Sequence, residues 1–171
     1  MLKTTIILTF LIHLLALSRL NAQLVERLPF NKQISIENGL SSYNVKKISQ
    51  DRYGFTWIVT QDGLNRFDGK NFLLYNKSAN IKHQLLGSDV WDIEEDSLRD
   101  MLWVVTSYGG LNGISLKTSE VIFSLKAKIA PGEFNHEWLR CLKLFKNELW
   151  IGTFDGLTIY NIEKKRFEKF R

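Results

Sequence analysis

The chain has 171 residues, of which 44% are hydrophobic and 24% charged, and this composition is typical of a globular protein. The formal net charge of +5 falls to +3 once Lys3 and Arg19, which lie in the N-terminal leader, are left out. A balance this mild indicates solubility and does not support nucleic-acid binding, which needs a dense basic patch. Cys141 is the single cysteine, so an intrachain disulfide is excluded, and its apolar neighbours predict a small core residue.

Residues 1–22 have the three parts of a secretory signal peptide. Lys3 supplies the positive start, residues 6–17 form a mostly apolar stretch of 12 residues, and Ala22 marks the expected cleavage site. Twelve residues are too few to cross a bilayer comfortably, which makes an uncleaved anchor the weaker alternative. No other stretch of the sequence is apolar enough to span a membrane, so we expect an exported protein.

Three stretches after the leader repeat one pattern, and each is centred on a tryptophan. The tryptophans are Trp57, Trp103 and Trp150, and they are separated by 46 and 47 residues. Each precedes small or apolar residues, a threonine, and a turn that ends in glycine and leucine; the first copy reads Trp57-Ile-Val-Thr-Gln-Asp-Gly-Leu. A fixed period of this size predicts an array of structural repeats.

The elements expected in chain order are short strands separated by turns. Residues 34–36 alternate like a strand, and Asn38-Gly39 closes it. The first repeat predicts strands at 45–48, 55–60, 64–67 and 72–75, with Asp62-Gly63 as a type I′ hairpin turn. The second predicts strands at 90–93, 102–106, 111–116 and 121–123, with an acidic loop at 94–100. After a connecting loop at 125–135, the third predicts strands at 139–145, 149–153, 157–160 and 166–170.

Four short strands in each unit predict the blades of a β-propeller. The second strands are apolar nearly throughout, as expected where neighbouring blades cover both faces of a sheet, and the repeated tryptophans are expected in these interfaces. A β-sandwich is the alternative, but it does not explain the repeat period. We expect an all-β chain with a signal peptide at 1–22, an entry strand within 23–39, and four-stranded blades at 40–80, 81–130 and 131–171.

The repeats resemble those of the two-component regulator propeller family. Residues 40–69 are similar to the family's repeat, Leu149-Trp-Ile-Gly-Thr153 matches its second strand at every letter, and residues 36–42 are similar to its entry into the first blade. Val59 and Val105 depart from the pattern, because the family often has glycine there. The resemblance covers about residues 30–171.

The resemblance implies a periplasmic sensor of a two-component system. In this family such repeats build the extracytoplasmic part of sensor histidine kinases, including hybrid kinases that detect oligosaccharides; a homodimer is expected in the full-length context. No kinase motif and no second hydrophobic span follow in this sequence, and a closed propeller has about four to eight blades. We therefore expect an N-terminal fragment, an incomplete arc whose partners are the remaining blades. The strand at 34–36 would complete the missing last blade.

The sequence contains no convincing catalytic, metal or cofactor motif, so we expect no cofactor and no enzyme activity. Asp62 and Asp155 recur at one repeat position, but each precedes a turn glycine, where aspartate is favoured for backbone reasons. The acidic cluster at 94–96 with Asp100 lacks the spacing of a calcium loop, which favours a solvated loop over a cation site.

A ligand is expected on the propeller face that carries the loops entering strand one and the loops between strands two and three, around the channel. Aromatic faces beside amide and carboxylate groups suit sugar recognition. The alternative is that these side chains pack the loops against neighbouring blades. The candidate ligand-binding residues are Asn44, Gln61, Asp62, Asp89, Trp91, Tyr108, His136, Trp138, Phe154 and Asp155.

The sequence thus favours a fragment of a periplasmic sensing propeller, with an oligosaccharide as the ligand class that the resemblance implies. Two alternatives stay open. One is a propeller-type periplasmic lyase or hydrolase, which would need acid, base or metal groups at the channel and would turn over a candidate glycan. The other is a truncated remnant without activity of its own.

Overall fold

The computed structural model describes residues 33–128 and 134–168. The chain divides into two units, Met1–Ile34 and Ser35–Arg171, and every strand of the described residues belongs to the second. The predicted signal peptide and its cleavage site lie outside the described residues. None of the helices in the described part of the chain has the length and hydropathy needed to cross a membrane.

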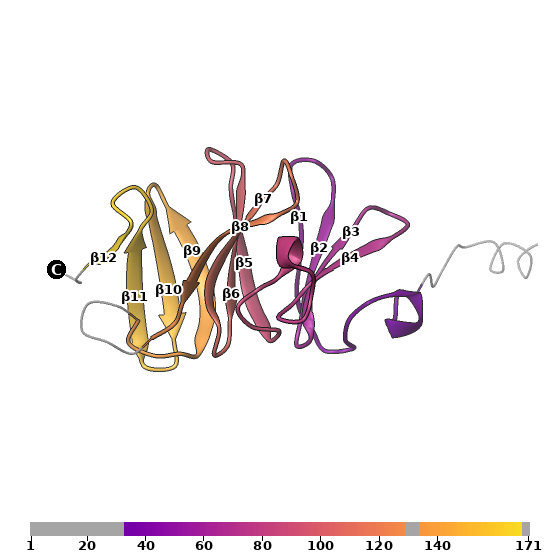
Figure 1. The fold of residues 1–171 in the computed structure, drawn as a ribbon, viewed down its shortest axis with the longest axis horizontal. Coiled ribbons are helices and arrows are strands. Elements are labelled where there is room, and N and C mark those ends of the chain that lie inside the picture. Colours follow the sequence, from indigo (N-terminus) through magenta and orange to yellow (C-terminus); the bar gives the residue numbers. More distant parts are fainter. Residues whose placement is uncertain (1–32, 129–133, 169–171) are drawn as a thin grey trace, which may run out of the picture. The chain divides into compact units, whose positions relative to one another are not determined.

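The second unit contains three four-stranded antiparallel sheets that follow one another along the chain (Figure 1). The first sheet consists of β1 (Val45–Gln50), β2 (Thr56–Thr60), β3 (Gly63–Phe67) and β4 (Phe72–Tyr75). The second consists of β5 (Val90–Asp96), β6 (Met101–Thr106), β7 (Gly110–Ser115) and β8 (Val121–Lys126). The third consists of β9 (Leu139–Phe145), β10 (Glu148–Thr153), β11 (Gly156–Asn161) and β12 (Arg166–Glu168). Strand order within each sheet follows the sequence, and the predicted all-β class with propeller blades is confirmed.

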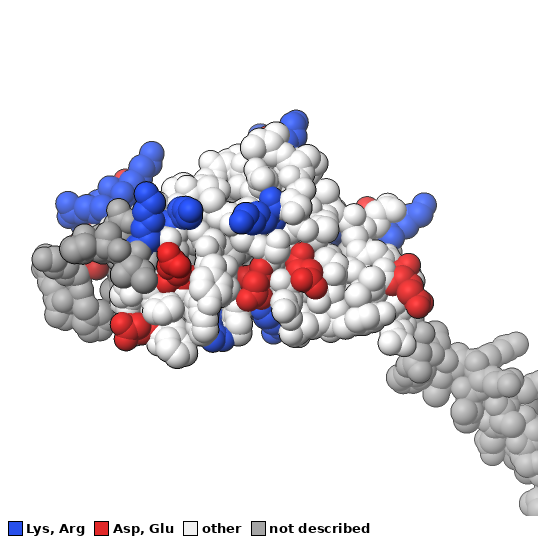
Figure 2. Space-filling view, turned by 60° about the horizontal axis from the view of Figure 1, so that its bottom comes forward, with Lys and Arg blue, Asp and Glu red and all other residues white. Residues whose placement is uncertain are grey.

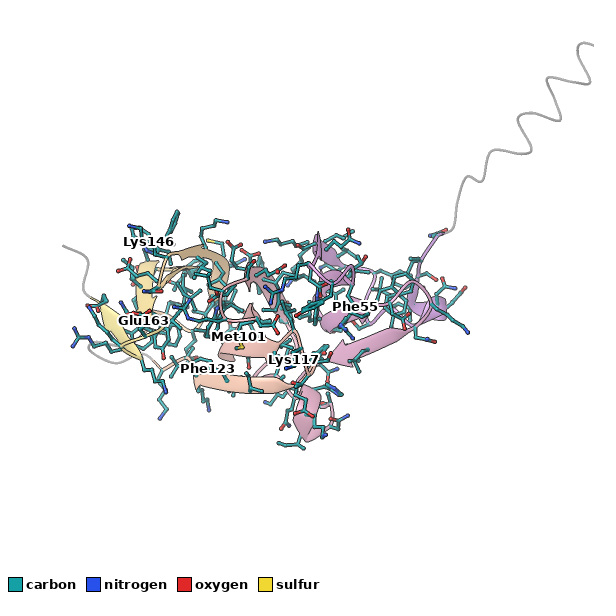
Figure 3. The ribbon with its side chains drawn as sticks, turned by 90° about the horizontal axis from the view of Figure 1, so that it is seen from above. Phe55, Met101, Lys117, Phe123, Lys146 and Glu163 are labelled. Carbon is teal, nitrogen blue, oxygen red and sulfur yellow. The ribbon has the colours of Figure 1, made fainter. Side chains whose placement is uncertain are left out.

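Both faces of the second sheet are covered, as a propeller blade requires. Strand β6 is buried at every residue, and its alternate side chains point to opposite faces. Leu102 and Val104 enter a core shared with the first sheet, whereas Met101, Trp103 and Val105 enter a core shared with the third. The apolar pattern of the second strands therefore reflects burial from two sides. Figure 3 shows Met101 and Phe123 on this sheet.

The repeated tryptophans differ in their surroundings. Trp57 and Trp103 take equivalent places in the two cores and are 1% and 3% exposed. Trp150 is half-buried and belongs to neither core, so the interface position is confirmed for Trp57 and Trp103 and stays a prediction for Trp150. Leu149 and Ile151 occupy the face of β10 that meets the second sheet, which leaves Trp150 on the opposite face. Its ring lies 5.5 Å from that of Phe145.

The first strands of the three sheets meet at one edge of the array, because β5 contacts both β1 and β9. Ion pairs join them: Lys47 Nζ lies 2.6 Å from Asp92 Oδ1, and Lys143 pairs with Glu94. Figure 2 shows acidic groups beside basic groups across one face. The first strands therefore lie where a propeller has its channel.

The loop entering each first strand is held by one repeated polar contact. A backbone N–H of the loop donates to a polar side chain at the third position of strand three. The three bonds run from Ser41 to Asn65 Oδ1 (3.0 Å), from Leu86 to Asn112 Oδ1 (3.0 Å) and from Asn135 to Thr158 Oγ1 (3.5 Å). Because these acceptors are buried, the contacts fix the loops that carry the candidate ligand residues.

The entry segment is not a strand. Ile36–Asn38 form the 3-10 helix η1, so the predicted strand at 34–36 is wrong. Asn38 Oδ1 accepts the N–H of Ser35 at 3.0 Å, and Gly39 adopts a φ of 105°. A strand needs a partner for its backbone groups, and the described residues provide none here, so the local turn forms. That this segment completes a last blade stays a prediction.

The turn between β2 and β3 is also not the predicted one. Thr60 pairs with Gly63, which leaves Gln61 and Asp62 as the turn residues, and neither has a positive φ. The type I′ prediction over Asp62-Gly63 is therefore wrong. Gly63 has a φ of 149°, and a Cβ at this position would lie 2.6 Å from Leu74 Cδ1. The close approach of β4 accounts for glycine here.

Two predictions of exposure or burial are reversed. Residues 94–96 continue β5 rather than forming a solvated loop, and Asp96 is fully buried. Its Oδ2 accepts hydrogen bonds from Arg99 Nη1 (2.9 Å) and from Trp103 Nε1 (3.3 Å), because the extended strand turns this carboxylate inward. Cys141, expected in the core, is exposed, because Leu139 and Leu142 supply the buried side chains of β9.

Candidate functional site

The loops predicted to carry ligand residues lie side by side in each sheet. In every blade, a backbone N–H of the loop between strands two and three donates to a carbonyl in the loop entering strand one. These bonds run from Gln61 to Asn44 (3.3 Å), from Ser107 to Asp89 (2.9 Å) and from Phe154 to Trp138 (3.0 Å). The two sets of loops therefore share one face of the array.

Four side chains of these loops form a continuous group, here named the aromatic cluster: Tyr108, His136, Trp138 and Phe154. Trp138 is at its centre, with ring centroids 5.2 Å from Tyr108, 5.2 Å from Phe154 and 5.8 Å from His136. Tyr108 comes from the second sheet and the other three from the third, so the cluster crosses the blade interface. Tyr108 and Phe154 are 59% and 65% exposed, which leaves aromatic surface open to a ligand.

The backbone defines how the cluster presents its polar groups. Tyr108 has a φ of 58°, and its N–H donates to Glu137 O at 2.9 Å, which ties the loop of the second sheet to the third. His136 Nδ1 accepts the N–H of Trp138 at 2.9 Å. The neutral imidazole therefore carries its proton on Nε2, where it is a hydrogen-bond donor for a hydroxyl or carbonyl oxygen.

Trp91 is held between two cations. Lys46 Nζ and Arg140 Cζ each lie 4.0 Å from the centroid of its rings. Its indole N–H donates to Asp89 Oδ2 at 2.8 Å, and Asp89 also pairs with Lys46. The predicted residues Asp89 and Trp91 are thus brought together, but the cations occupy the ring faces that a sugar would need.

Lys46 and Arg140 were not among the predicted site residues. Each is the second residue of its first strand, as Trp91 is of β5, so the three hold one position of the repeat. The sequence carries this signal, but turns of different length separate the three residues from the repeated tryptophans and obscure it.

The remaining four candidates are not members of the aromatic cluster, although Asp155 follows Phe154 in the same loop. Asn44 Nδ2 donates to Gln61 Oε1 at 3.1 Å on the first sheet, and Asp62 is exposed beside them. Within the described part of the chain, no hydrogen bond or ring contact joins these three residues to the cluster. Asp155 is exposed, and its backbone carbonyl accepts a hydrogen bond from Asn135, which supports the turn role weighed for it. A part in ligand binding stays a prediction for all ten candidates.

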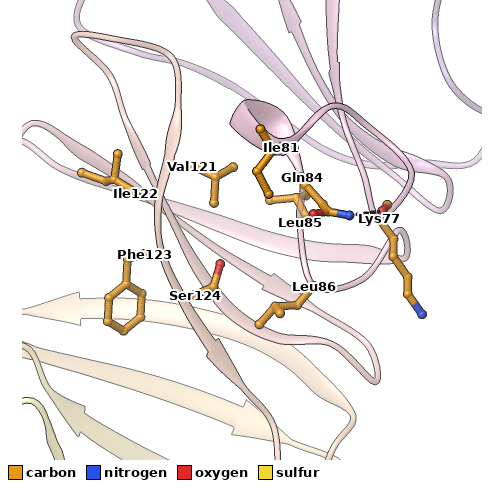
Figure 4. Close-up of a pocket in the computed structure, with 9 residues that line it drawn as sticks. All are labelled: Lys77, Ile81, Gln84, Leu85, Leu86, Val121, Ile122, Phe123 and Ser124. Atoms are coloured by element: carbon orange, nitrogen blue, oxygen red, sulfur yellow. Dashed lines mark hydrogen bonds between the residues drawn. The ribbon is translucent and has the colours of Figure 1, made fainter.

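Two hollows lie elsewhere on the second unit. One, of about 500 Å³, lies between the 3-10 helix η2 (Ile81–His83) and β8 (Figure 4). The other, of about 560 Å³, is lined at the far end of the third sheet by residues such as Phe145 and Glu163. Neither is lined by residues of the aromatic cluster.

Comparison with known proteins relates this fold to sensor domains, although no protein-family model matches the chain. The extracellular domain of the putative hybrid two component system BT3049 from B. thetaiotaomicron superposes with a TM-score of 0.71 at 25% identity, over 82% of this chain and 20% of that one. The extracellular domain of BT4673 from the same organism gives 0.62 at 19% identity, over 77% and 19%. Histidine kinase P4 of Formosa agariphila is 46% identical over 41 residues, 24% of this chain and 3% of that protein.

The chain has the fold of a two-component sensor ectodomain. The resemblance to sensors of two-component systems is thereby confirmed. The chain spans about a fifth of the length of the solved sensor ectodomains and 3% of the histidine kinase. Its three sheets correspond to part of such an ectodomain.

Proposed function

We propose that this chain senses an oligosaccharide outside the cytoplasm as part of a two-component receptor. The observation that supports this function best is the aromatic cluster, which presents Tyr108 and Phe154 to solvent beside the Nε2–H donor of His136. Flat aromatic surface with a few directed polar groups suits the apolar faces and hydroxyls of a sugar. The signal peptide expected at residues 1–22 would deliver the chain to the periplasm, and the kinase would be a separate part of the receptor.

The position of the cluster suggests how binding would be transmitted. Tyr108 belongs to the second sheet and Trp138 to the third, so a saccharide that contacts both would favour one arrangement of the two blades. A ligand shifts a conformational equilibrium only through its different affinities for the two states. Chemical turnover plays no part in this proposal, and the chain itself would have no enzyme activity.

Titration of the chain with oligosaccharides tests the proposal. We expect binding to change the tryptophan fluorescence, and the double substitution Tyr108→Ala, Phe154→Ala to weaken affinity at least about tenfold, because about 1.4 kcal/mol of stacking is lost. Phe145→Ala is the matched control, since this ring is 53% exposed and lies at the opposite end of β9 from Trp138. Binding that survives the double substitution and is lost in the control would contradict the proposed site.

A further inference from the structure

The first strands of the sheets carry four basic residues, and all but one of them form ion pairs. Three of the four form ion pairs across the blade interfaces: Lys46 with Asp89, Lys47 with Asp92, and Lys143 with Glu94. The fourth is Arg140 of β9. It forms no ion pair and no hydrogen bond among the described residues, although the acidic residues of β5 lie on the neighbouring strand.

Arg140 is held by aromatic faces instead. Its Cζ atom lies 4.0 Å from the ring centroid of Trp91 and 5.5 Å from that of Trp138, and the side chain is half-buried. An aromatic face attracts the guanidinium but accepts none of its five N–H donors in the plane of the group. The two aromatic rings therefore hold the guanidinium in place, and its N–H groups remain available to hydrogen-bond another partner.

The partner must be found beside the aromatic cluster, because Trp138 contacts both Arg140 and the exposed rings of Tyr108 and Phe154. We therefore expect a molecule that packs on those rings to come within reach of the guanidinium. His136, also in contact with Trp138, adds the Nε2–H donor at the same surface.

We propose that Arg140 binds the oxyanion of an acidic oligosaccharide whose sugar ring packs on the aromatic cluster. This inference rests on the proposed function. A guanidinium matches the two oxygens of a carboxylate or sulfate in a bidentate pair, which is stronger and more directional than a contact with a neutral hydroxyl. A neutral sugar offers the fork hydroxyl oxygens alone, which form weaker bonds, so the site favours saccharides that carry a uronate or a sulfate ester.

Calorimetric titration of the full chain with matched pairs tests this specificity. The pairs are tetragalacturonate with its carboxyl-reduced form, and a sulfated galactose tetrasaccharide with its desulfated form. We expect the acidic member of one pair to bind at least about tenfold more tightly, and the pair that shows this identifies the oxyanion. Arg140→Gln abolishes the preference while affinity for the neutral member persists, which also shows that the variant is folded. Arg140→Lys retains part of the preference, because it keeps the charge without the fork.

Lys143→Gln is the matched control, because Lys143 lies on the same strand but is paired with Glu94. This variant keeps the preference for the acidic saccharide. Equal affinity for acidic and neutral members in both pairs, unchanged by Arg140→Gln, overturns the inference and leaves the proposed function standing. If no member of either pair binds, the proposed function fails and the inference fails with it.

Discussion

At the scale of single residues, buried carboxylates tie the interface tryptophans to the turns before them. Asp51 Oδ2 accepts the indole N–H of Trp57 at 2.7 Å, and its Oδ1 accepts the N–H groups of Tyr53 and Phe55. Asp96 does the same for Trp103 in the second sheet. In the third sheet the turn is shorter, and the indole of Trp150 donates to Glu148 at 3.0 Å.

Asp51 is 6% exposed and accepts three hydrogen bonds. Replacing it by alanine leaves these three donors without an acceptor. We expect Asp51→Ala to lower the free energy of unfolding by about 2–4 kcal/mol, because buried donors lose charge-assisted bonds. Denaturant unfolding measures this loss. Asp62→Ala is the control, and as an exposed turn residue it is expected to cost less than about 0.5 kcal/mol. Equal costs for the two variants would contradict the role given to Asp51.

These carboxylates show a limit of prediction from the sequence at this scale. The tryptophans could be recognised because a large aromatic residue recurs at a fixed period. The aspartates precede them by six and seven residues, and an acidic residue near a turn is ordinarily solvated. Only the extension of β5 to Asp96 shows that this carboxylate points inward.

At the scale of elements, a polar contact joins the turn after β1 to the turn after β5. Arg52 pairs with Asp100 and donates from Nη1 to Ser97 O at 2.6 Å, and Tyr53 Oη donates to Asp100 Oδ1 at 3.0 Å. The hydrogen bond from Arg52 lowers the pKa of Asp100 below its usual value, with a further bond from Tyr53 acting in the same direction. This contact connects the first two blades near the surface.

The lowered pKa of Asp100 predicts how the docking of these blades depends on pH. A carboxyl group with a lower pKa in the folded state binds fewer protons there than in the unfolded state. Its stabilising effect is therefore complete above about pH 4 and is lost as the pH falls through the folded pKa. Urea unfolding between pH 2 and pH 7 should show a shallower acid dependence for Asp100→Asn, and likewise for Arg52→Gln. An unchanged profile in both variants would contradict this assignment.

The strands themselves were largely predictable, because the apolar pattern around each tryptophan fixes the second strand and the glycine turns fix its neighbours. Strands β4 and β9 lie where the sequence placed them, at Phe72–Tyr75 and Leu139–Phe145. The segment at 34–36 was not predictable in the same way, since a strand depends on a partner that its own sequence does not contain. The contacts between first strands were not predicted for a related reason. Each contact joins two different repeats, so the sequence of one repeat does not contain its partner.

At the scale of the whole described chain, two shared cores join three sheets, and the loops of one face carry the aromatic cluster. The sequence predicted that face from propeller topology, and its candidate residues include all four members of the cluster. It did not reveal that Lys46 and Arg140 lie over the rings of Trp91. It also did not reveal that Arg140 lies beside the cluster without an ion pair among the described residues. These features depend on side chains from neighbouring blades.

Hydrogen–deuterium exchange tests most directly whether the face that carries the aromatic cluster binds the ligand. Exchange is measured with and without the oligosaccharide that binds most tightly in the titration series. We predict slower exchange of backbone amides in residues 107–109, 136–138 and 153–155, whose loops carry the aromatic cluster. The hollow between η2 and β8 provides the internal comparison, and exchange in residues 81–86 and 121–124 should not change. Protection confined to that hollow, with the loops of the aromatic cluster unaffected, would contradict the account.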